Sequence, residues 1–351
     1  MEFTHAMQKS LKLYLILLFT IFSTSFLKAQ GLFTQKQIIN QYTTVGIGAG
    51  TSHEFTDLST LKYFHYSLYT NVRWNVHAHF TRYFSKNVAG RLQLSWVRLL
   101  GDDYTYSQRN MDVLWSYYIR NLHYRNDVKE ATLSGIFNLI PSYGKGRGGQ
   151  SRLKFTPYFT VGIGLAAHSP MATTPITGSP NDGTWTTLRD KSTSGQIIPG
   201  STQKQYSLVI PVLPIGMGAR VKLNKKLDLT FEGNLRLTNS DYIDDVAKVP
   251  YPDQDALAAY LGDNAAFSFR ATEAINSRNK INRIPLLQSL YSEKTNNIIG
   301  PGWSPDNIQE LYGPERPNTF RGGSARPDFY FTTQVTLSYI LSDKIKCPVL
   351  K

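Results

Sequence analysis

Two histidines in this sequence have a spacing that a metal ion accepts. His77 and His79 are two residues apart in a segment of alternating polarity, so their side chains share one face. Two histidines without a third ligand make a weak metal site. The pattern favours polar filling of a protein interior.

Other histidines fall where a catalytic acid or base of a membrane enzyme would be needed, near the bases of predicted loops. They are His53, His65, His123 and His168. None of them belongs to a recognisable nucleophile–base pattern. We therefore predict a non-enzymatic protein with no catalytic, cofactor-binding or metal-binding residues.

Aspartates gather in one part of the chain, at positions 241, 244, 245, 253 and 255. Calcium prefers such carboxylates, but the spacing does not match an EF-hand loop. We interpret this stretch as the solvated start of a loop.

Three segments carry a Gly-x-Gly pattern, namely Val45–Gly48, Val161–Gly164 and Ile215–Gly218. No helix pattern follows the first, which argues against a phosphate-binding loop. Inward glycines instead leave room for long side chains inside a narrow barrel. The charged residues expected to pair across this interior are Arg73, Arg91, Glu130, Glu232 and Arg236. The barrel should be plugged by its own side chains.

The chain has a single cysteine, Cys347, which excludes an intramolecular disulfide framework. In an oxidising compartment a lone cysteine suggests an intermolecular disulfide or a free thiol.

These residues are positioned by segments of about ten residues with period-2 alternation. The predicted strands are 43–51, 67–84, 88–99, 129–139, 154–167, 206–223, 227–237 and 328–341. In the sixth strand Pro211 and Pro214 cannot donate ladder hydrogen bonds, so we expect a bulge or a late start there.

The connections between the predicted strands alternate in length. Residues 85–87 and 224–226 form tight turns and 140–152 a moderate link, whereas the other connections are long. This pattern predicts an all-β fold, an eight-stranded antiparallel up-and-down transmembrane barrel with long extracellular loops. Both termini would then be periplasmic. A soluble β-sandwich also alternates, but the regular loop lengths favour the barrel.

The N-terminus has the pattern of a targeting segment. Lys9 and Lys12 precede an apolar run that ends before Ala29, which predicts a signal peptide over residues 1–29. Residues 30–351 would form an integral outer-membrane barrel domain. Mean hydropathy is −0.29, and no later apolar stretch is long enough for a spanning helix.

The formal net charge of +13 invites a nucleic-acid partner, but the basic residues are scattered rather than clustered. We therefore expect no nucleic-acid binding. The last connection, 238–327, contains a helix candidate over 253–262 and is interpreted as a partly ordered extracellular cap.

Basic residues gather on the side of the short turns, where they could contact an acidic partner or anionic lipid. The candidate contacts are Cys347, Lys344, Lys346, Lys145, Arg147, Lys225 and Lys226.

Three stretches resemble motifs of one family. Their residues are Arg120, Asn121, Asp127 and Glu130, then Asp241, Tyr242, Asp244 and Asp245, and finally Arg321, Gly322, Gly323 and Asp328. The second stretch, Ser-Asp-Tyr-Ile-Asp-Asp-Val, is the most specific. The family is the PorG-like outer-membrane β-barrels of the type IX secretion system of Bacteroidota. The resemblance covers nearly all of the chain after residue 30.

The resemblance implies a non-enzymatic subunit that ties a periplasmic ring of PorK-like and PorN-like proteins to the outer membrane. Such a ring serves cargo secretion and, in gliding species, gliding motility. Since the first two motifs map to the bases of long loops, we expect them to pack loops. Two alternatives remain, a lipid-modifying outer-membrane enzyme and a ligand-binding or adhesin barrel that uses its long loops.

Overall fold

The computed structural model describes residues 42–59, 63–146, 149–314, 319–323 and 326–341. The predicted signal peptide and the C-terminal residues Lys344, Lys346 and Cys347 lie outside these ranges.

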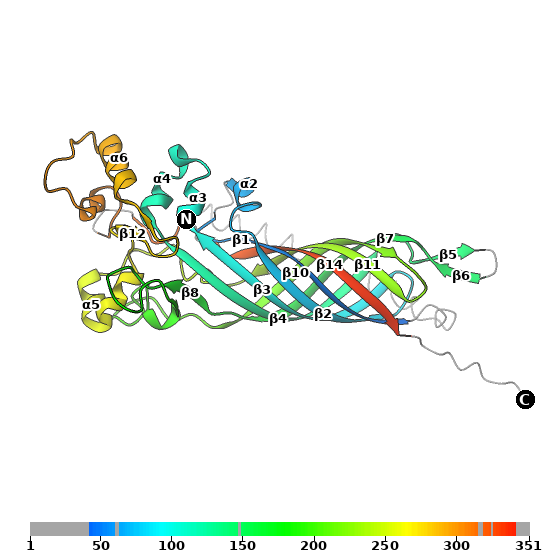
Figure 1. Ribbon diagram of the computed structural model, residues 1–351. Coiled ribbons are helices and arrows are strands. Elements are labelled where there is room, and N and C mark those ends of the chain that lie inside the picture. Colours follow the sequence, from blue (N-terminus) through cyan, green and yellow to red (C-terminus); the bar gives the residue numbers. More distant parts are fainter. Residues whose placement is uncertain (1–41, 60–62, 147–148, 315–318, 324–325, 342–351) are drawn as a thin grey trace, which may run out of the picture.

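Eight long antiparallel strands form a closed barrel (Figure 1). They are β1 (Tyr42–Phe55), β2 (Arg73–Tyr83), β3 (Val88–Asp102), β4 (His123–Asn138), β7 (Phe155–Ala167), β10 (Val209–Lys222), β11 (Leu227–Thr238) and β14 (Phe329–Leu341). Each pairs with its neighbours in chain order, and β1 pairs with β14 to close the ring. The predicted fold class is confirmed.

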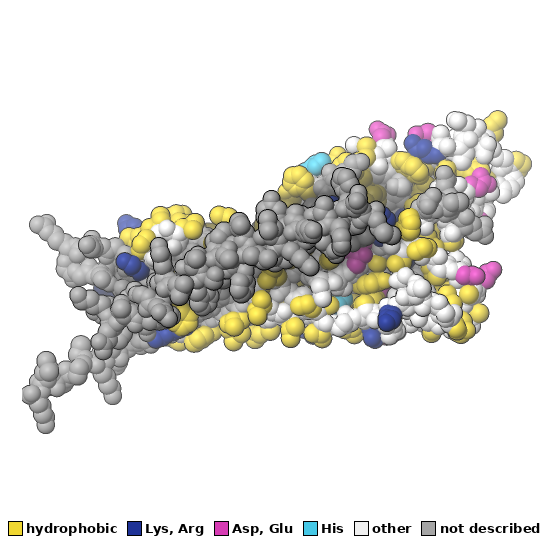
Figure 2. Space-filling view, turned by 180° about the vertical axis from the view of Figure 1, so that it is seen from behind, with side chains coloured by type: hydrophobic (Ala, Val, Ile, Leu, Met, Phe, Trp, Pro, Cys, Tyr) yellow, Lys and Arg dark blue, Asp and Glu magenta, His cyan; other side chains and the backbone are white. Residues whose placement is uncertain are grey.

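The two faces of the strands differ in polarity as a membrane barrel requires. Outward residues such as Ile47, Leu94 and Ile163 are 71%, 59% and 68% exposed although they are large and apolar. Inward neighbours such as Gln93 and Thr132 are polar and buried. Hydrophobic side chains cover much of the barrel wall visible in Figure 2. Because a closed barrel pairs all its strands, lipid can surround this apolar wall. The chain is a transmembrane barrel of the outer-membrane type.

Helices of the described ranges are all too short or too polar to cross a membrane.

The two ends of the barrel differ. At one end, the turn end, short turns join β2 to β3 and β10 to β11. The link between β4 and β7 carries a small hairpin there, β5 (Tyr143–Gly146) and β6 (Gly149–Arg152). The opposite end, the loop end, bears the four long connections (Figure 1). This alternation matches the sequence-based expectation.

The long connections contain most of the remaining structure. Their elements are α2 (Phe64–Ser67), α3 (Asp103–Ser107), α4 (Met111–Arg120), β8 (Pro170–Thr173), β9 (Trp185–Thr187), η4 (Arg189–Lys191), α5 (Gln254–Leu261), η5 (Gly262–Phe267), β12 (Ile275–Asn276), β13 (Ile281–Asn282), α6 (Ile284–Thr295) and η6 (Pro305–Glu310). The helix expected at 253–262 is α5, and Asp253 caps its N-terminus through its side chain.

Strand bounds differ from the prediction mainly at the loop end. Strands β1, β3 and β4 extend past the expected limits, because their ladders continue beyond the apolar band that alternation detects. Strand β2 starts six residues later than expected, at Arg73 instead of Ser67, since Phe64–Ser67 forms a helical turn. The sixth strand starts late, at Val209, and its register with β11 runs unbroken from Val212–Thr238 to Lys222–Asp228.

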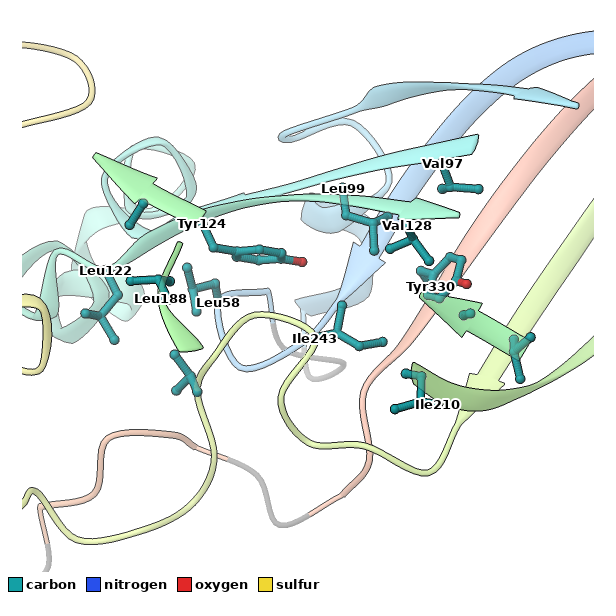
Figure 3. Close-up of a cluster of buried hydrophobic side chains, with 14 of the residues drawn as sticks. Leu58, Val97, Leu99, Leu122, Tyr124, Val128, Leu188, Ile210, Ile243 and Tyr330 are labelled. Carbon is teal, nitrogen blue, oxygen red and sulfur yellow. The ribbon is translucent and has the colours of Figure 1, made fainter. Parts of the chain in front are cut away.

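Two hydrophobic clusters stabilise the loop end. The first fills the barrel mouth, where inward residues Val97, Val128 and Tyr330 meet the loop residues Leu58 and Ile243 (Figure 3). The second lies wholly in the loops, where α4 contributes Tyr118 and Ile119 and α6 contributes Leu287 and Leu290. The cap therefore has a small core of its own, which weak apolar periodicity in 238–327 did not reveal.

Candidate functional site

The barrel interior is filled by ion pairs that cross between non-adjacent strands. Arg91 on β3 binds Glu232 on β11 at 2.8 Å, and Arg236 on β11 binds Glu130 on β4 at 3.1 Å. Tyr158 donates a hydrogen bond to Glu232. All these groups are buried, and their pairing satisfies charges that could not remain single in such surroundings. The interior is plugged, as predicted.

Two details of this interior correct the sequence-based expectation. Arg73 does not join the paired charges, because it is the first residue of β2 and lies half-buried at the loop end, where it donates to the Val72 carbonyl. Moreover, Gly46 and Gly48 leave room for His79 and His77 rather than for charged chains. A Cβ on Gly46 would lie 2.6 Å from a carbon of the His79 ring, and a Cβ on Gly48 would lie 2.5 Å from a carbon of the His77 ring.

The histidine pair therefore occupies the interior. His77 Nε2 lies 2.9 Å from Thr336 Oγ1, and His79 Nε2 lies 3.4 Å from Ser338 Oγ. Both rings reach across the glycines of β1 to β14, where hydroxyls are their partners.

The three family-like stretches meet at the loop end in one buried network. Arg120 pairs with Asp103 at 2.7 Å and also donates to the carbonyls of Asp57 and Arg321. Arg321 in turn pairs with Asp245 at 3.2 Å. Each of these side chains is almost fully buried. Residues distant in sequence are thereby joined beneath the loops.

Hydroxyls and main-chain amides complete the second stretch. Asp245 accepts hydrogen bonds from Thr193 and Tyr206, and Tyr206 stacks on Tyr242 with ring centroids 4.9 Å apart. Asp244 accepts from the amides of Asp57 and Val246. The expectation of a solvated acidic loop start is wrong for Asp244 and Asp245, each only 1% exposed. Their amide and hydroxyl donors compensate for the lost water.

Gly322 and Gly323 allow the third stretch to approach Asp57. The amide of Gly323 donates to Asp57 Oδ1 at 3.0 Å. A Cβ on Gly322 would lie 2.1 Å from Asp57 Oδ2 and 2.7 Å from the Ala247 carbonyl carbon, so only glycine fits. Asp328 accepts from the amide of Ile243 at 2.9 Å.

Carboxyl groups crowd this region, and their acidity changes accordingly. Burial, together with repulsion from Asp57, raises the pKa of Asp241 to about 7. Burial and neighbouring carboxylates raise the pKa of Asp244 and Asp328 well above the usual range. Burial also raises the pKa of Asp103 to about 6, although Arg120 opposes the shift.

The first motif is divided among three places. Arg120 and Asn121 join the network, and Asn121 adopts a left-handed conformation (φ 60°) that ends α4. Glu130 points into the interior, where it pairs with Arg236. Asp127 faces outward and forms a two-bond ion pair with Arg98, at 2.7 and 2.9 Å.

Sequence reasoning did not find several members of this network. Asp57, Asp103, Tyr206, Arg270 and Arg283 are all buried at the loop end. Arg283, for example, donates to the carbonyls of Tyr118 and Ile119 at the end of α4. No local pattern distinguishes these residues from ordinary loop charges. Asp103 offers a weak signal, since it begins a helix directly after a strand.

The candidate catalytic histidines are separately engaged. His53 contacts the Thr51 hydroxyl, His123 the Thr173 hydroxyl and amide, and His168 the Ser207 carbonyl. His65 is exposed on α2, and its ring centroid lies 4.0 Å from that of Tyr66 at an interplanar angle of 49°. Within the described residues no cluster of three His, Cys, Asp or Glu side chains has metal-binding geometry.

At the turn end the predicted basic contacts are partly described. Lys225 and Lys226 are exposed in the β10–β11 turn, and Lys226 Nζ lies 5.9 Å from the Tyr339 ring centroid. Lys145 lies on β5, whereas Arg147 is outside the described residues. The acidic side chains visible in Figure 2 lie toward the loop end.

No protein-family model and no curated protein matches this sequence. Among the solved structures that align with this chain are two at 7% identity, each with a TM-score of 0.33. The alignment with Neisserial surface protein A covers 96% of that protein and 85% of this chain. The second structure is Ail, the attachment invasion locus protein of Yersinia pestis, in complex with the heparin analogue sucrose octasulfate. This alignment covers 99% of Ail and 86% of this chain.

Proposed function

We propose that this protein is a non-enzymatic outer-membrane subunit of a type IX secretion machinery and anchors a periplasmic ring of PorK-like and PorN-like proteins. The observation that carries the proposal is the meeting of all three family-like stretches in one buried region, through Arg120, Arg321, Asp245 and Asp328. Arg120 of the first stretch shares this structural task with the other two stretches, which supports the resemblance, whereas Asp127 and Glu130 of the first stretch lie elsewhere.

The plugged interior supports an anchoring role over a transport pore. The pairs Arg91–Glu232 and Arg236–Glu130 cross the interior between non-adjacent strands. Below them, at the turn end, Tyr42 stacks on Tyr83 with centroids 4.2 Å apart, and Arg220 lies 4.7 Å from the Tyr83 ring. The barrel thus offers surfaces at its ends and wall for contact rather than a passage.

In this proposal the turn end faces the periplasm and meets the ring. Lys225 and Lys226 are exposed cations at this end, and they suit an acidic ring surface. Lys145, Arg147, Lys344 and Lys346 would extend the same basic rim.

Affinity purification tests the proposal. A tagged chain extracted from outer membranes with mild detergent should co-purify with the PorK-like and PorN-like proteins. Charge reversal by Lys225→Glu with Lys226→Glu should lower the yield of ring proteins several-fold, because rim charges govern association. Lys204→Glu, an exposed change in a loop, is the matched control. Unchanged ring recovery with the double variant would remove the basic rim from the contact, and normal secretion after gene deletion would overturn the function.

A covalent contact through Cys347 would provide an independent test of a periplasmic partner. We propose an intermolecular disulfide between Cys347 and a periplasmic partner. A non-reducing gel should then show a heavier species that Cys347→Ser abolishes. A monomeric band alone would refute the disulfide without touching the ring contact.

The enzymatic alternative makes an opposite prediction for the histidines. If the barrel modified lipid, replacing His53, His65, His123 and His168 together should abolish the modification. In the anchoring proposal the exposed His65→Ala variant leaves secretion unchanged. Removing part of the cap distinguishes the adhesin alternative from the anchoring proposal. An adhesin would lose ligand binding, whereas an anchor would still recover the ring proteins.

A further inference from the structure

The outer wall of the barrel is hollowed along β1, β2 and β3. Two adjoining grooves of about 560 and 760 Å³ share Ile47, Ala78 and Leu94 as lining residues. These three residues face one another across the strands, since Ile47 pairs with Ala78 and Ala78 with Leu94. The small Ala78 side chain between two large ones forms the floor, and Ala49 continues it toward the loop end.

One groove ends at a pair of tryptophans. Trp96 lines it, and the Trp74 and Trp96 rings meet edge to face with centroids 5.2 Å apart. Tryptophans at this level mark the boundary between hydrocarbon and headgroups. An apolar groove that reaches this boundary can hold a lipid acyl chain against the wall.

Basic residues lie beside the tryptophans and in the next row toward the loop end. Lys129 pairs with Trp96 in the β3–β4 register and is exposed, and the next outward row holds Arg98 and Asp127. Arg98 lies 5.0 Å from the Trp74 ring centroid while it holds Asp127. Arg125, two residues nearer the loop end on β4, lies over the Trp185 ring at 4.4 Å and adds its charge to this surface. Three cations against one carboxylate leave a net charge of +2 at the mouth of the groove.

We propose that this wall is a specific site for a phosphorylated, multiply acylated lipid of the leaflet at the loop end. One acyl chain lies in the groove over Ala78, and a headgroup phosphate meets Lys129 beside Trp96. The complementarity of charge selects this occupant, because Asp127 compensates only one of the three cations and an uncharged lipid would leave the excess positive charge without a counter-ion. The site is independent of the proposed ring contact, which concerns the other end of the barrel.

Native mass spectrometry of the full chain in detergent tests this site. The probe is lipid A carrying two phosphates, compared with its dephosphorylated form. The wild-type protein should retain one lipid A and prefer it about tenfold over the dephosphorylated lipid. Ala78→Leu fills the groove and should weaken retention about tenfold. Lys129→Gln leaves the groove open and should abolish the preference for phosphate.

Two control variants match these changes elsewhere. Ala219→Leu on β10, four strands away around the ring, and Lys225→Gln at the turn end should retain lipid within about twofold of wild type. Equal retention by Ala78→Leu and wild type would overturn the groove, and an unchanged phosphate preference in Lys129→Gln would overturn the headgroup contact. Full displacement by inorganic phosphate at equal concentration would show a simple anion site and also overturn the proposal. Loss of ring recovery with retained lipid would concern only the anchoring function.

Discussion

The guanidinium of Arg120 donates a hydrogen bond of 3.1 Å to the main-chain carbonyl of Arg321, a residue 201 positions later in the chain. The same guanidinium holds Asp103, and Arg321 holds Asp245. Two buried arginines thus connect the loop after β3 with both ends of the longest loop. This connection determines how the cap is fixed on the barrel.

Replacing Arg321 should loosen the cap while the barrel stays intact. Arg321→Gln leaves the Asp245 carboxylate buried without its cation, which typically costs about 3–5 kcal/mol. Limited proteolysis should cut the loops of this variant much faster than those of wild type, while the heat-dependent gel mobility of the barrel is retained. Lys204→Gln, which removes an exposed cation, should leave the cleavage rate unchanged. Equal cleavage of Arg321→Gln and wild type would contradict the role given to Arg321.

The crowded carboxyls make cap stability depend on pH. The pKa of Asp241 is about 7 in the folded state and lower when unfolded, and the pKa values of Asp244 and Asp328 are shifted in the same direction. The folded cap therefore holds protons that the unfolded chain has released. Its stability falls as pH rises from about 4 through 7. Loop proteolysis should be slower at pH 5 than at pH 8.

Asp241→Asn tests the assignment of this pH dependence. The neutral amide cannot ionise, so the variant should lose part of the difference in cleavage rate between pH 5 and pH 8. Asp253→Asn, at the exposed N-terminal capping position of helix α5, is the control and should keep the wild-type difference in cleavage rate. If the cleavage rates of Asp241→Asn and wild type depended on pH in the same way, other groups would be responsible for the pH dependence.

In each interior ion pair, either charge should need its partner for the barrel to stay stable. Glu232→Gln leaves Arg91 buried without a full counter-charge and should lower the free energy of unfolding by about 3–5 kcal/mol. Arg91→Met with Glu232→Leu removes both charges and should recover most of that loss. Urea unfolding in detergent, arranged as a double-mutant cycle, measures the difference. Additive losses in the double variant would contradict the pairing.

Glycine at position 48 should be needed for packing. A Cβ there would lie 2.5 Å from the Val335 carbonyl oxygen as well as from the His77 ring, so the backbone itself must shift. Gly48→Ala should therefore destabilise the barrel by about 1–3 kcal/mol, measured as the midpoint of thermal loss of compact gel mobility. Gly90→Ala should be tolerated better, since its nearest neighbour is the movable, half-exposed ring of Phe84.

Alternation of polarity along the chain was enough to predict the barrel, because the outward and inward residues of each strand can be recognised within that strand alone. Strand β11 was expected at 227–237 and ends at Thr238. At the loop end the same signal fails. His123–Val128 lies in β4, but outward Arg125 and Asp127 are charged there, above the apolar band, so alternation of polarity no longer marks the strand.

The site was harder to predict than the fold, since its contacts join residues distant in the sequence. Asp245 gives no sign in the sequence that Arg321 and Thr193 will reach it, and a run of aspartates normally indicates solvent. Likewise, the inward glycines were correctly expected to make space, but only the register between β1 and β2 shows that His77 and His79 take it.

The closure of the barrel between its first and last strands has a mechanical consequence. Strands β1 and β14 lie side by side from Thr43–Leu341 to Phe55–Phe329, so the beginning of β1 and the end of β14 meet at the same rim. A pull on either strand along its length loads this ladder in shear, and its hydrogen bonds resist together instead of opening one after another. Tension applied at that rim is therefore spread over the whole height of the wall.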